Sequence, residues 1–294
     1  MGTWGIGLYS DDYALDIRTM VSAVLRLPMN GDELLDLLRK EELCADNPDD
    51  SDHFIFWLVV ADQFARRGVE CEEAKRRALE IIDKGLGLQD LEERGMSPGD
   101  LKARQKKLAE LAEKIRNPPP AKPRKTIKSK QPFLAEKGSV WCYPTMEGET
   151  INPYFKSVEE EGFVQDGWGA MLVVDRGHAF EFLAWYAVVP VYLRSTVKPT
   201  LDDVVKARLY LVQWHSWDPS TKSKVSGGAG TLSRSHMNKM QFELLGKVNL
   251  NEAMIPEHLT EYANSHAASD CGITGALHVA LERKNGPPVK RWLA

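Results

Sequence analysis

Residues 2–16 read GTWGIGLYSDDYALD, a glycine-rich stretch that runs directly into an acid-capped helical pattern. Glycine adopts backbone angles that other residues avoid and lets neighbouring groups approach closely. We therefore expect this terminus to be pinned into the fold, with Trp4 in the core. Asp11 or Asp12 should lie at the start of a helix, where negative charge is favourable. The stretch has no metal-ligand spacing and no phosphate-binding loop, so it indicates a fold rather than a chemistry.

Apolar residues recur with helical spacing after this start, beginning with Ala14, Ile17, Val21 and Val24. Acidic first turns, basic last turns and glycines just beyond them match the preferences of helix ends. No strand pattern interrupts this region, which predicts an all-helical domain over residues 1–116. The expected helices cover about 11–27, 32–40, 52–67, 70–84 and 98–116.

Residues 117–132 read NPPPAKPRKTIKSKQP and contain five basic residues and no acidic one. Prolines lack a backbone donor and favour extended chain, so this segment is expected to be a semi-rigid linker. It is interpreted first as a solvated connection. The alternative is a docking strip for an acidic surface or a nucleic acid.

From residue 133 to residue 294 the pattern changes to short aromatic and β-branched runs bounded by turn residues, which is typical of strands. We expect a tight hairpin turn at 175–178, a helical turn at 201–205 and a flexible loop at 226–231. A helix is expected near 256–265 and a final strand near 276–282. The chain therefore predicts an α+β fold, in which an all-helical N-terminal domain precedes a small, strongly bent β-sheet or barrel-like domain with one or two helices.

The chain has 294 residues, of which 43% are hydrophobic and 27% charged, and a net charge of −4. This charge argues against nonspecific nucleic-acid binding as the main function. The apolar runs are shorter than the roughly 20 residues of a membrane-spanning helix, and the start lacks a secretory signal pattern. The cysteines show no CxxC spacing and are expected to be reduced thiols. We therefore expect a cytoplasmic protein with no cofactor, no metal ion and no membrane contact. The cysteines are Cys44, Cys71, Cys142 and Cys271.

The opening stretch resembles a bacterial family of unknown function whose members begin Gly-Ala-Trp-Gly-x-Gly-x-Phe-x-Asn-Asp-x-Ala-x-Asp. Thr3 stands where that family has Ala, and Tyr9 where it has Phe. Residues 57–64 and 78–83 are similar to later segments of the family, so the resemblance covers roughly the first 115 residues. It implies a bacterial protein and carries over no site residues.

The second half resembles the barrel-type immunity proteins of bacterial polymorphic toxin systems. Those proteins carry Gly-Asp-Val-Phe-x-x-Pro near their start, and residues 138–144 here read GSVWCYP, with Ser139 in place of the Asp. This resemblance implies a protein that binds and neutralises a cognate toxin and performs no catalysis.

Residues 41–52 read EELCADNPDDSD, with six acidic residues and no basic one. A nuclease toxin presents Lys and Arg to phosphates, so an acidic patch can steer its association and cover its surface. We expect Asp46, Asp49, Asp50 and Asp52 to make this contact. The alternative is a solvated loop in which Ser51 or Asp52 caps the next helix. Calcium is not expected, because the EF-hand spacing is missing.

Trp214 and Trp217, in the run WHSW, are further candidates for contact with a partner. Aromatic side chains anchor protein interfaces and can stack on bases. The alternative is that both tryptophans lie on a strand and belong to the apolar core of the domain.

The histidines form no HExxH pattern. Ser265 and His266 lie close in sequence to Asp270 and Cys271, but sequence proximity does not define a catalytic triad. We expect a non-catalytic bacterial immunity protein that binds and occludes a cognate protein toxin, for example a basic nuclease. One alternative is a hydrolase with an interdomain site, which needs a pocket where a His, a carboxylate and a Cys or Ser converge. The other is a nucleic-acid-associated binding module that uses the basic linker and exposed aromatic residues.

Overall fold

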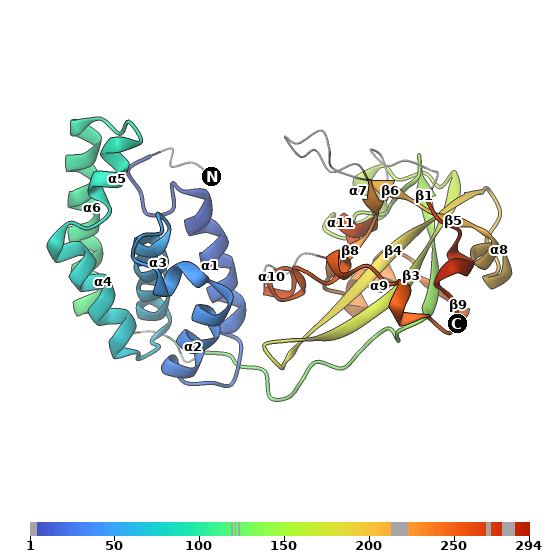
Figure 1. Ribbon diagram of the computed structural model, residues 1–294, viewed down its shortest axis with the longest axis horizontal. Helices are drawn as coiled ribbons and strands as arrows, with labels where there is room; N and C mark the ends of the chain where they lie inside the picture. Colours follow the sequence, from blue (N-terminus) through green and yellow to red (C-terminus); the bar gives the residue numbers. More distant parts are fainter. Residues whose placement is uncertain are drawn as a thin grey trace. The chain divides into compact units, whose positions relative to one another are not determined.

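The computed structural model describes residues 5–118, 120, 122, 124–212, 223–268, 272–277 and 286–294, without the side chains of residues 194, 265, 266 and 268 (Figure 1). The chain divides into two compact units, Met1–Ser129 and Lys130–Ala294. The division lies inside the proline-rich segment 117–132. Trp4, which was expected in the core, lies outside the described residues.

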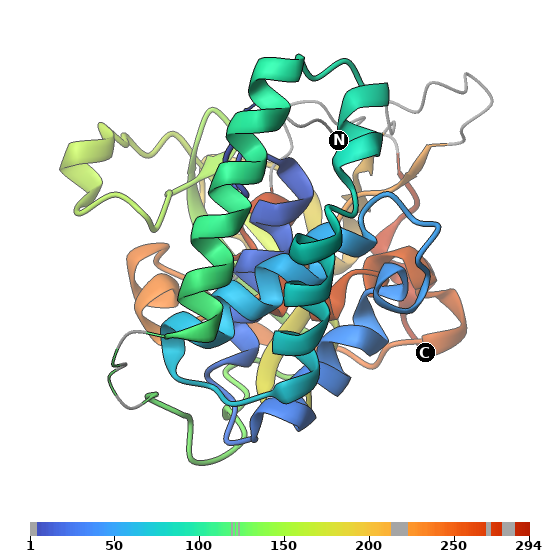
Figure 2. The same ribbon diagram turned by 90° about the vertical axis from the view of Figure 1, so that its left-hand side faces the viewer.

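The helical unit is built around α3 (His53–Arg67), which packs against several other helices (Figures 1 and 2). Every residue from Ile55 to Phe64 is buried. This central position explains why residues 55–61 are apolar on all sides of the helix instead of along one stripe. The other elements of the unit are α1 (Asp12–Val24), α2 (Gly31–Glu41), the 3-10 helix η1 (Leu43–Asp46), α4 (Glu72–Lys84), α5 (Leu88–Glu93) and α6 (Pro98–Arg116).

The ends of these helices follow the sequence signals. The side chain of Asp11 accepts a hydrogen bond from the backbone N–H of Ala14 at 3.1 Å and so caps α1. Gly68 and Gly85 end α3 and α4 with φ values of 63° and 64°, a conformation that favours glycine. The five predicted helices are therefore confirmed, with slightly different ends. The short helix α5 was not predicted, because it begins after Gly87 without a side-chain cap.

The second unit contains a curled antiparallel sheet in the order β2-β1-β3-β4-β5 (Figure 1). In addition, β9 pairs with β1 and β8 pairs with β4. The sheet closes only partway, as a half-barrel, and with the short helices around it confirms the predicted α+β fold. Its strands are β1 (Ser139–Met146), β2 (Glu149–Thr150), β3 (Gly167–Ala179), β4 (Leu183–Ser195), β5 (Arg208–Leu209), β8 (Gly228–Gly230) and β9 (Glu243–Lys247), and β6 (Leu211–Val212) pairs separately with β7 (Lys224–Val225).

Both faces of this sheet are covered. Successive side chains of a strand point to opposite faces. On β3, Leu172 belongs to one apolar cluster together with Trp292, whereas Met171 belongs to a second cluster together with Leu277. The first cluster includes residues of α8 (Leu201–Lys206) and η4 (Val289–Trp292), and the second includes residues of α9 (Arg234–Lys239) and α11 (Thr274–Leu277). The remaining short elements are α7 (Val158–Glu161), η2 (Glu252–Met254), η3 (Glu257–Leu259) and α10 (Ala263–Ala268).

Two glycines of β3 lie directly opposite aromatic residues. Gly169 pairs with Tyr143 of β1, and Gly177 pairs with Trp185 of β4. A Cβ atom at either glycine would lie within 2.6 Å of the facing ring. Since glycine in a strand permits this close approach and often marks a bend, these pairs help to explain how the long strand curls.

The predicted hairpin turn at 175–178 is wrong. These residues continue β3 and pair with residues 184–187 of β4. The turn lies instead at Phe180 and Glu181, whose φ values of 49° and 65° are those of a tight hairpin turn. Residues 175 and 176 carry charges within this strand. Asp175 forms an ion pair with Lys137, and Arg176 forms one with Glu136, so both charges are compensated there.

Two further expectations for this unit are wrong. Residues 226–231, expected to be a flexible loop, contain β8, which pairs with residues 186–188 of β4. Ala276 and Leu277, expected in a final strand, lie in α11, and residues 278–282 lie outside the described part. The helical turn expected at 201–205 is confirmed by α8. Among the described residues, no helix has the length and apolar character needed to cross a membrane.

Candidate functional site

The acidic segment 41–52 connects α2 to α3. Its backbone folds as successive short turns, in which the N–H of Asp50 donates to the carbonyl of Asn47 at 3.0 Å and the N–H of His53 donates to the carbonyl of Asp50 at 3.1 Å. The side chain of Asp50 also accepts from the N–H of Asp52 at 2.9 Å. Asn and Asp stabilise turns by such local bonds. The run NPDDSD therefore builds an ordered connection.

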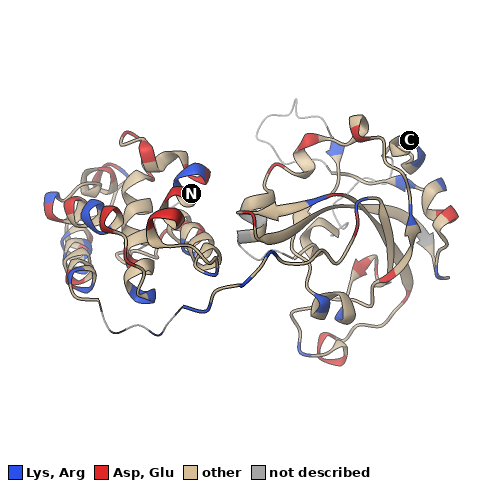
Figure 3. Ribbon diagram, turned by 90° about the horizontal axis from the view of Figure 1, so that it is seen from below, with Lys and Arg blue, Asp and Glu red and all other residues tan. Residues whose placement is uncertain are grey.

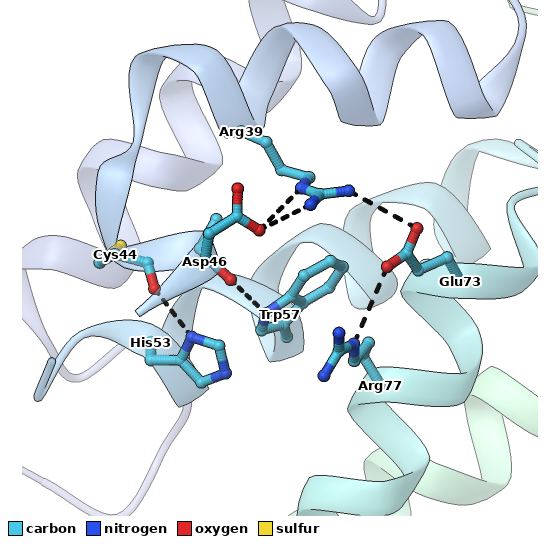
Figure 4. A network of polar contacts seen from close by, with 8 residues as sticks. Arg39, Cys44, Asp46, His53, Trp57, Glu73 and Arg77 are labelled. Carbon is cyan, nitrogen blue, oxygen red and sulfur yellow. Dashed lines mark hydrogen bonds and ion pairs between the residues drawn. The ribbon is translucent and has the colours of Figure 1, made fainter. Parts of the chain in front are cut away.

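Side chains of the neighbouring helices bond to the backbone and side chain of η1, and Figure 4 shows the contacts made by His53 and Trp57 of α3. Nδ1 of His53 lies 2.8 Å from the carbonyl oxygen of Cys44, and the indole N–H of Trp57 donates to the carbonyl of Ala45 at 3.2 Å. From α1, the hydroxyl of Tyr13 lies 2.8 Å from Sγ of Cys44. Because Cys44 and Ala45 are buried, this turn is fixed to α1 and α3.

Leu43, the residue before these buried positions, points into solvent. Its side chain is 83% exposed, the largest value among the big apolar residues of the described chain. Because the turn that carries Leu43 is already held in place, binding at this residue would cost little conformational entropy of the main chain. Leu43 was not predicted as a site residue. The signal available in the sequence was a single leucine within an acidic segment.

Asp46, one of the four predicted contact residues, is already ion-paired. Nη2 and Nε of Arg39 donate to its Oδ1 at 2.7 and 3.1 Å, and Nη1 of Arg39 lies 3.7 Å from Glu73 (Figure 4). Asp46 therefore joins η1 to α2 and α4, and its charge is compensated. The other three predicted acids, Asp49, Asp50 and Asp52, lie further along the same connection and are exposed or partly exposed.

Asp52 occupies the N-cap position of α3, but its side chain makes no capping hydrogen bond. Of the alternative interpretation, a solvated loop in which Ser51 or Asp52 caps the next helix, the capping by the side chain of Asp52 is therefore wrong, whereas the segment does connect two helices. Burial raises the pKa of the Asp52 carboxyl, and the neighbouring charges of Asp50 and Asp11 raise it further.

Carboxylates from α1 and from the end of α2 join those of the connection. Burial raises the pKa of Glu42, the hydrogen bond from Tyr13 lowers it, and the charges of Glu41, Asp52 and Asp16 raise it. Gathering like charges raises the free energy of their ionised forms, which a cationic partner would relieve. We call this region the acidic face; it consists of Leu43 with Asp16, Glu41, Glu42, Asp49, Asp50 and Asp52.

Several histidines bind backbone carbonyl groups and so have structural roles. Besides His53, Nε2 of His178 lies 2.8 Å from the carbonyl oxygen of Gln131, and Nε2 of His258 lies 2.9 Å from that of Val225. Among the described residues, no group of three or more His, Cys, Asp and Glu side chains is placed to hold a metal ion.

A hollow of about 200 Å³ beside Phe64, Cys71 and Ile115 has no histidine in its lining. Burial raises the pKa of Cys71 to about 11. This thiol is protonated at neutral pH, and a protonated thiol is a poor nucleophile. The hollow therefore does not supply the convergence of groups that the hydrolase alternative requires.

Part of the basic segment packs on the helical unit. The N–H of Ile127 donates to the carbonyl of Arg26 at 2.8 Å, and the guanidinium of Arg124 donates to the carbonyl of Met29. Lys125, Lys128 and Lys130 remain exposed, and Figure 3 shows basic and no acidic residues along this stretch. The remaining candidates, Trp214, Trp217, Asp270 and Cys271 and the side chains of Ser265 and His266, lie outside the described part.

No family model, no curated protein and no solved structure matches this chain. What the protein does must therefore be inferred from its own residues.

Proposed function

We propose that this protein binds a basic protein toxin and neutralises it by covering the active site of the toxin, without catalysing a reaction. The observation that carries this proposal is the exposed Leu43, held on a fixed turn in a connection that is rich in carboxylates. Protein interfaces typically combine a central anchor with a polar rim. A toxin as partner, and a bacterial cytoplasm as the place of action, are suggested by the resemblance of residues 138–144 to immunity proteins.

The charges of the acidic face would act mainly on association. A toxin that binds nucleic acid presents Lys and Arg, so opposite potentials steer the two proteins together. Exposed charges are screened within about 8 Å at physiological salt, so association should slow as salt is added. Leu43, in contrast, would be desolvated in the complex and would determine mainly how long the complex lasts.

The predicted contact residues take different roles in this proposal. Asp49, Asp50 and Asp52 would face the cationic partner directly. Asp46 would act indirectly, because its bond to Arg39 keeps η1 in place. Trp214 and Trp217 stay predicted contacts.

The experiment is co-expression with the toxin domains encoded beside this gene, followed by affinity measurement on the purified pair. Leu43→Ala should weaken binding about tenfold or more, and Asp49→Lys combined with Asp50→Lys should slow association. The matched controls are Leu244→Ala, which removes a 58% exposed leucine of β9, and Glu92→Lys, which reverses an exposed charge on α5. The proposal fails if the wild-type protein neither protects cells nor forms a complex at low salt. It also fails if the variants of the acidic face bind as the controls do.

A further inference from the structure

A second hollow, of about 190 Å³, opens in the helical unit between α3, α6 and the segment that precedes α1. Its charged lining comprises four cations and two carboxylates, a surplus of two positive charges. The cations are Arg66, Arg104, Lys107 and Lys114, and the carboxylates are Asp62 and Glu110.

Both carboxylates of this hollow already have cationic partners. Nε of Arg66 lies 2.8 Å from Asp62, and Nζ of Lys107 lies 2.9 Å from Glu110. The hydroxyl of Tyr9 also donates to Asp62. Within the described part of the chain, Arg104 and Lys114 form no salt bridge. The surplus charge of the hollow is therefore located on these two side chains.

Arg104 is buried although it is charged. Only 3% of the residue is exposed, its Nη1 donates one hydrogen bond to the carbonyl of Ile6 at 3.3 Å, and its Nε has no hydrogen-bond partner among the described residues. Burial lowers the pKa of Arg104, which the charge of Asp11 partly opposes. A guanidinium has five N–H donors, and leaving them unsatisfied in the interior is costly. Among the described residues, the Nε–H of Arg104 therefore lacks an acceptor.

Lys114, the second of these cations, lies ten residues beyond Arg104 on α6, which is about 15 Å along the helix axis, so the two charges are well separated along the hollow. Residues 104, 107, 111 and 114 recur at a spacing that places them along one face of the helix, and all four line the hollow. Opposite them, Gln63 donates to the hydroxyl of Tyr9 at 2.6 Å and holds it against Asp62, which is 2% exposed. Asp62 also bonds to Arg66, and among the described residues it forms no salt bridge with Arg104.

We propose that this hollow binds a small, doubly charged organic oxyanion, a phosphate ester or a dicarboxylate, with one oxyanion group at Arg104 and with Lys114 adding positive charge further along the hollow. The planar fork of arginine matches two oxygens of either group, and lysine supplies a point charge. Bound there, the anion would join α6 to residues 6–9. This inference goes beyond the proposed function and does not depend on the acidic face.

The experiment measures thermal unfolding and calorimetric binding of the full chain with inorganic phosphate, glycerol 3-phosphate and succinate. Sodium chloride keeps the ionic strength constant. At least one oxyanion should raise the unfolding midpoint with a saturating dependence on concentration, as expected for a ligand that binds the folded state. The comparison of glycerol 3-phosphate with succinate shows which group is preferred.

Variants then locate the binding. Lys114→Gln, on the exposed side of α6, should weaken affinity about threefold or more while the protein stays folded. Arg67→Gln, an exposed arginine that does not line the hollow, is the matched control and should bind as the wild type does. Arg104→Gln should abolish the saturable shift; if it does not fold, Lys114→Glu replaces it. The proposal is overturned if none of the three anions gives a saturable shift, or if both Lys114 variants bind like the control.

Discussion

The hydroxyl of Tyr13 donates a hydrogen bond to Oε2 of Glu42 at 3.0 Å and lies 2.8 Å from Sγ of Cys44. These two partners are the residues on either side of Leu43. Tyr13, a buried residue of α1 that is distant in sequence, therefore helps to set the position of the exposed leucine, together with His53 and Trp57 of α3.

Replacing this tyrosine tests the relationship directly. Tyr13→Phe keeps the ring but removes the hydroxyl, so we expect the free energy of unfolding to fall by about 1 kcal/mol. Amide hydrogens of residues 43–46 should exchange faster, because the turn loses its bonds to α1. Urea denaturation and hydrogen exchange measure the two effects. Unchanged exchange at these amides would show that the turn does not need Tyr13.

The acidic face should lower stability at neutral pH. Burial raises the pKa values of Glu42 and Asp52, so the folded state binds their protons more tightly than the unfolded state does. The stabilisation from these protons is complete at low pH and is lost as the pH rises through the raised values.

Asp52→Asn should therefore unfold at a higher urea concentration than the wild type at pH 7. The difference should vanish near pH 3, where both side chains are neutral. Asp36→Asn is the control, because Asp36 attracts Arg39 and its removal gives no gain. A variant Asp52→Asn that is less stable than the wild type at pH 7 would contradict the assignment.

Arg39 and Asp46 should be energetically coupled. Their side chains are 30% and 59% exposed, so the coupling is that of a surface pair, up to about 1 kcal/mol. A double-mutant cycle with Arg39→Met and Asp46→Asn measures it, and added salt should reduce it. A coupling of zero at low salt would mean that this bond does not hold η1.

In the second unit, Gly169→Ala should be destabilising. The new Cβ would lie 2.5 Å from the ring of Tyr143, which is 3% exposed and has little room to move. Overpacking of this kind costs about 1–3 kcal/mol. Gly228→Ala is the matched control, because its Cβ would meet no atom within 4 Å. Equal unfolding midpoints for the two variants would be incompatible with the close pairing of Gly169 and Tyr143.

Local signals predicted the helices well, because their ends carry their own chemistry at Asp11, Gly68 and Gly85. The hairpin turn was predicted at the wrong place, since Asp175-Arg176-Gly177-His178 has the composition of a turn. The real turn uses Phe180 and Glu181, whose residue types give no such signal.

Local sequence signals were also insufficient to predict which residues of the two candidate sites are exposed or buried. The acids of the connection were visible in the sequence, whereas the exposure of Leu43 depends on Tyr13 and Trp57, which approach only in the fold. The burial of Arg104 likewise depends on the packing of residues 6–9 against α6. Composition predicts which charges are present, and tertiary contacts decide which of them remain available.

The turn at Phe180 and Glu181 has a consequence for the order in which the second unit assembles. It joins two strands of 13 residues each, β3 and β4, so their pairing needs no long loop to close. Hairpins of this kind form in about 1–10 μs, whereas pairing of β1 with β9 must first bring together distant parts of the chain. We expect this hairpin to be structured in the folding transition state. Glu181→Gly should then change the folding rate, and Leu244→Ala on β9 should change mainly the unfolding rate.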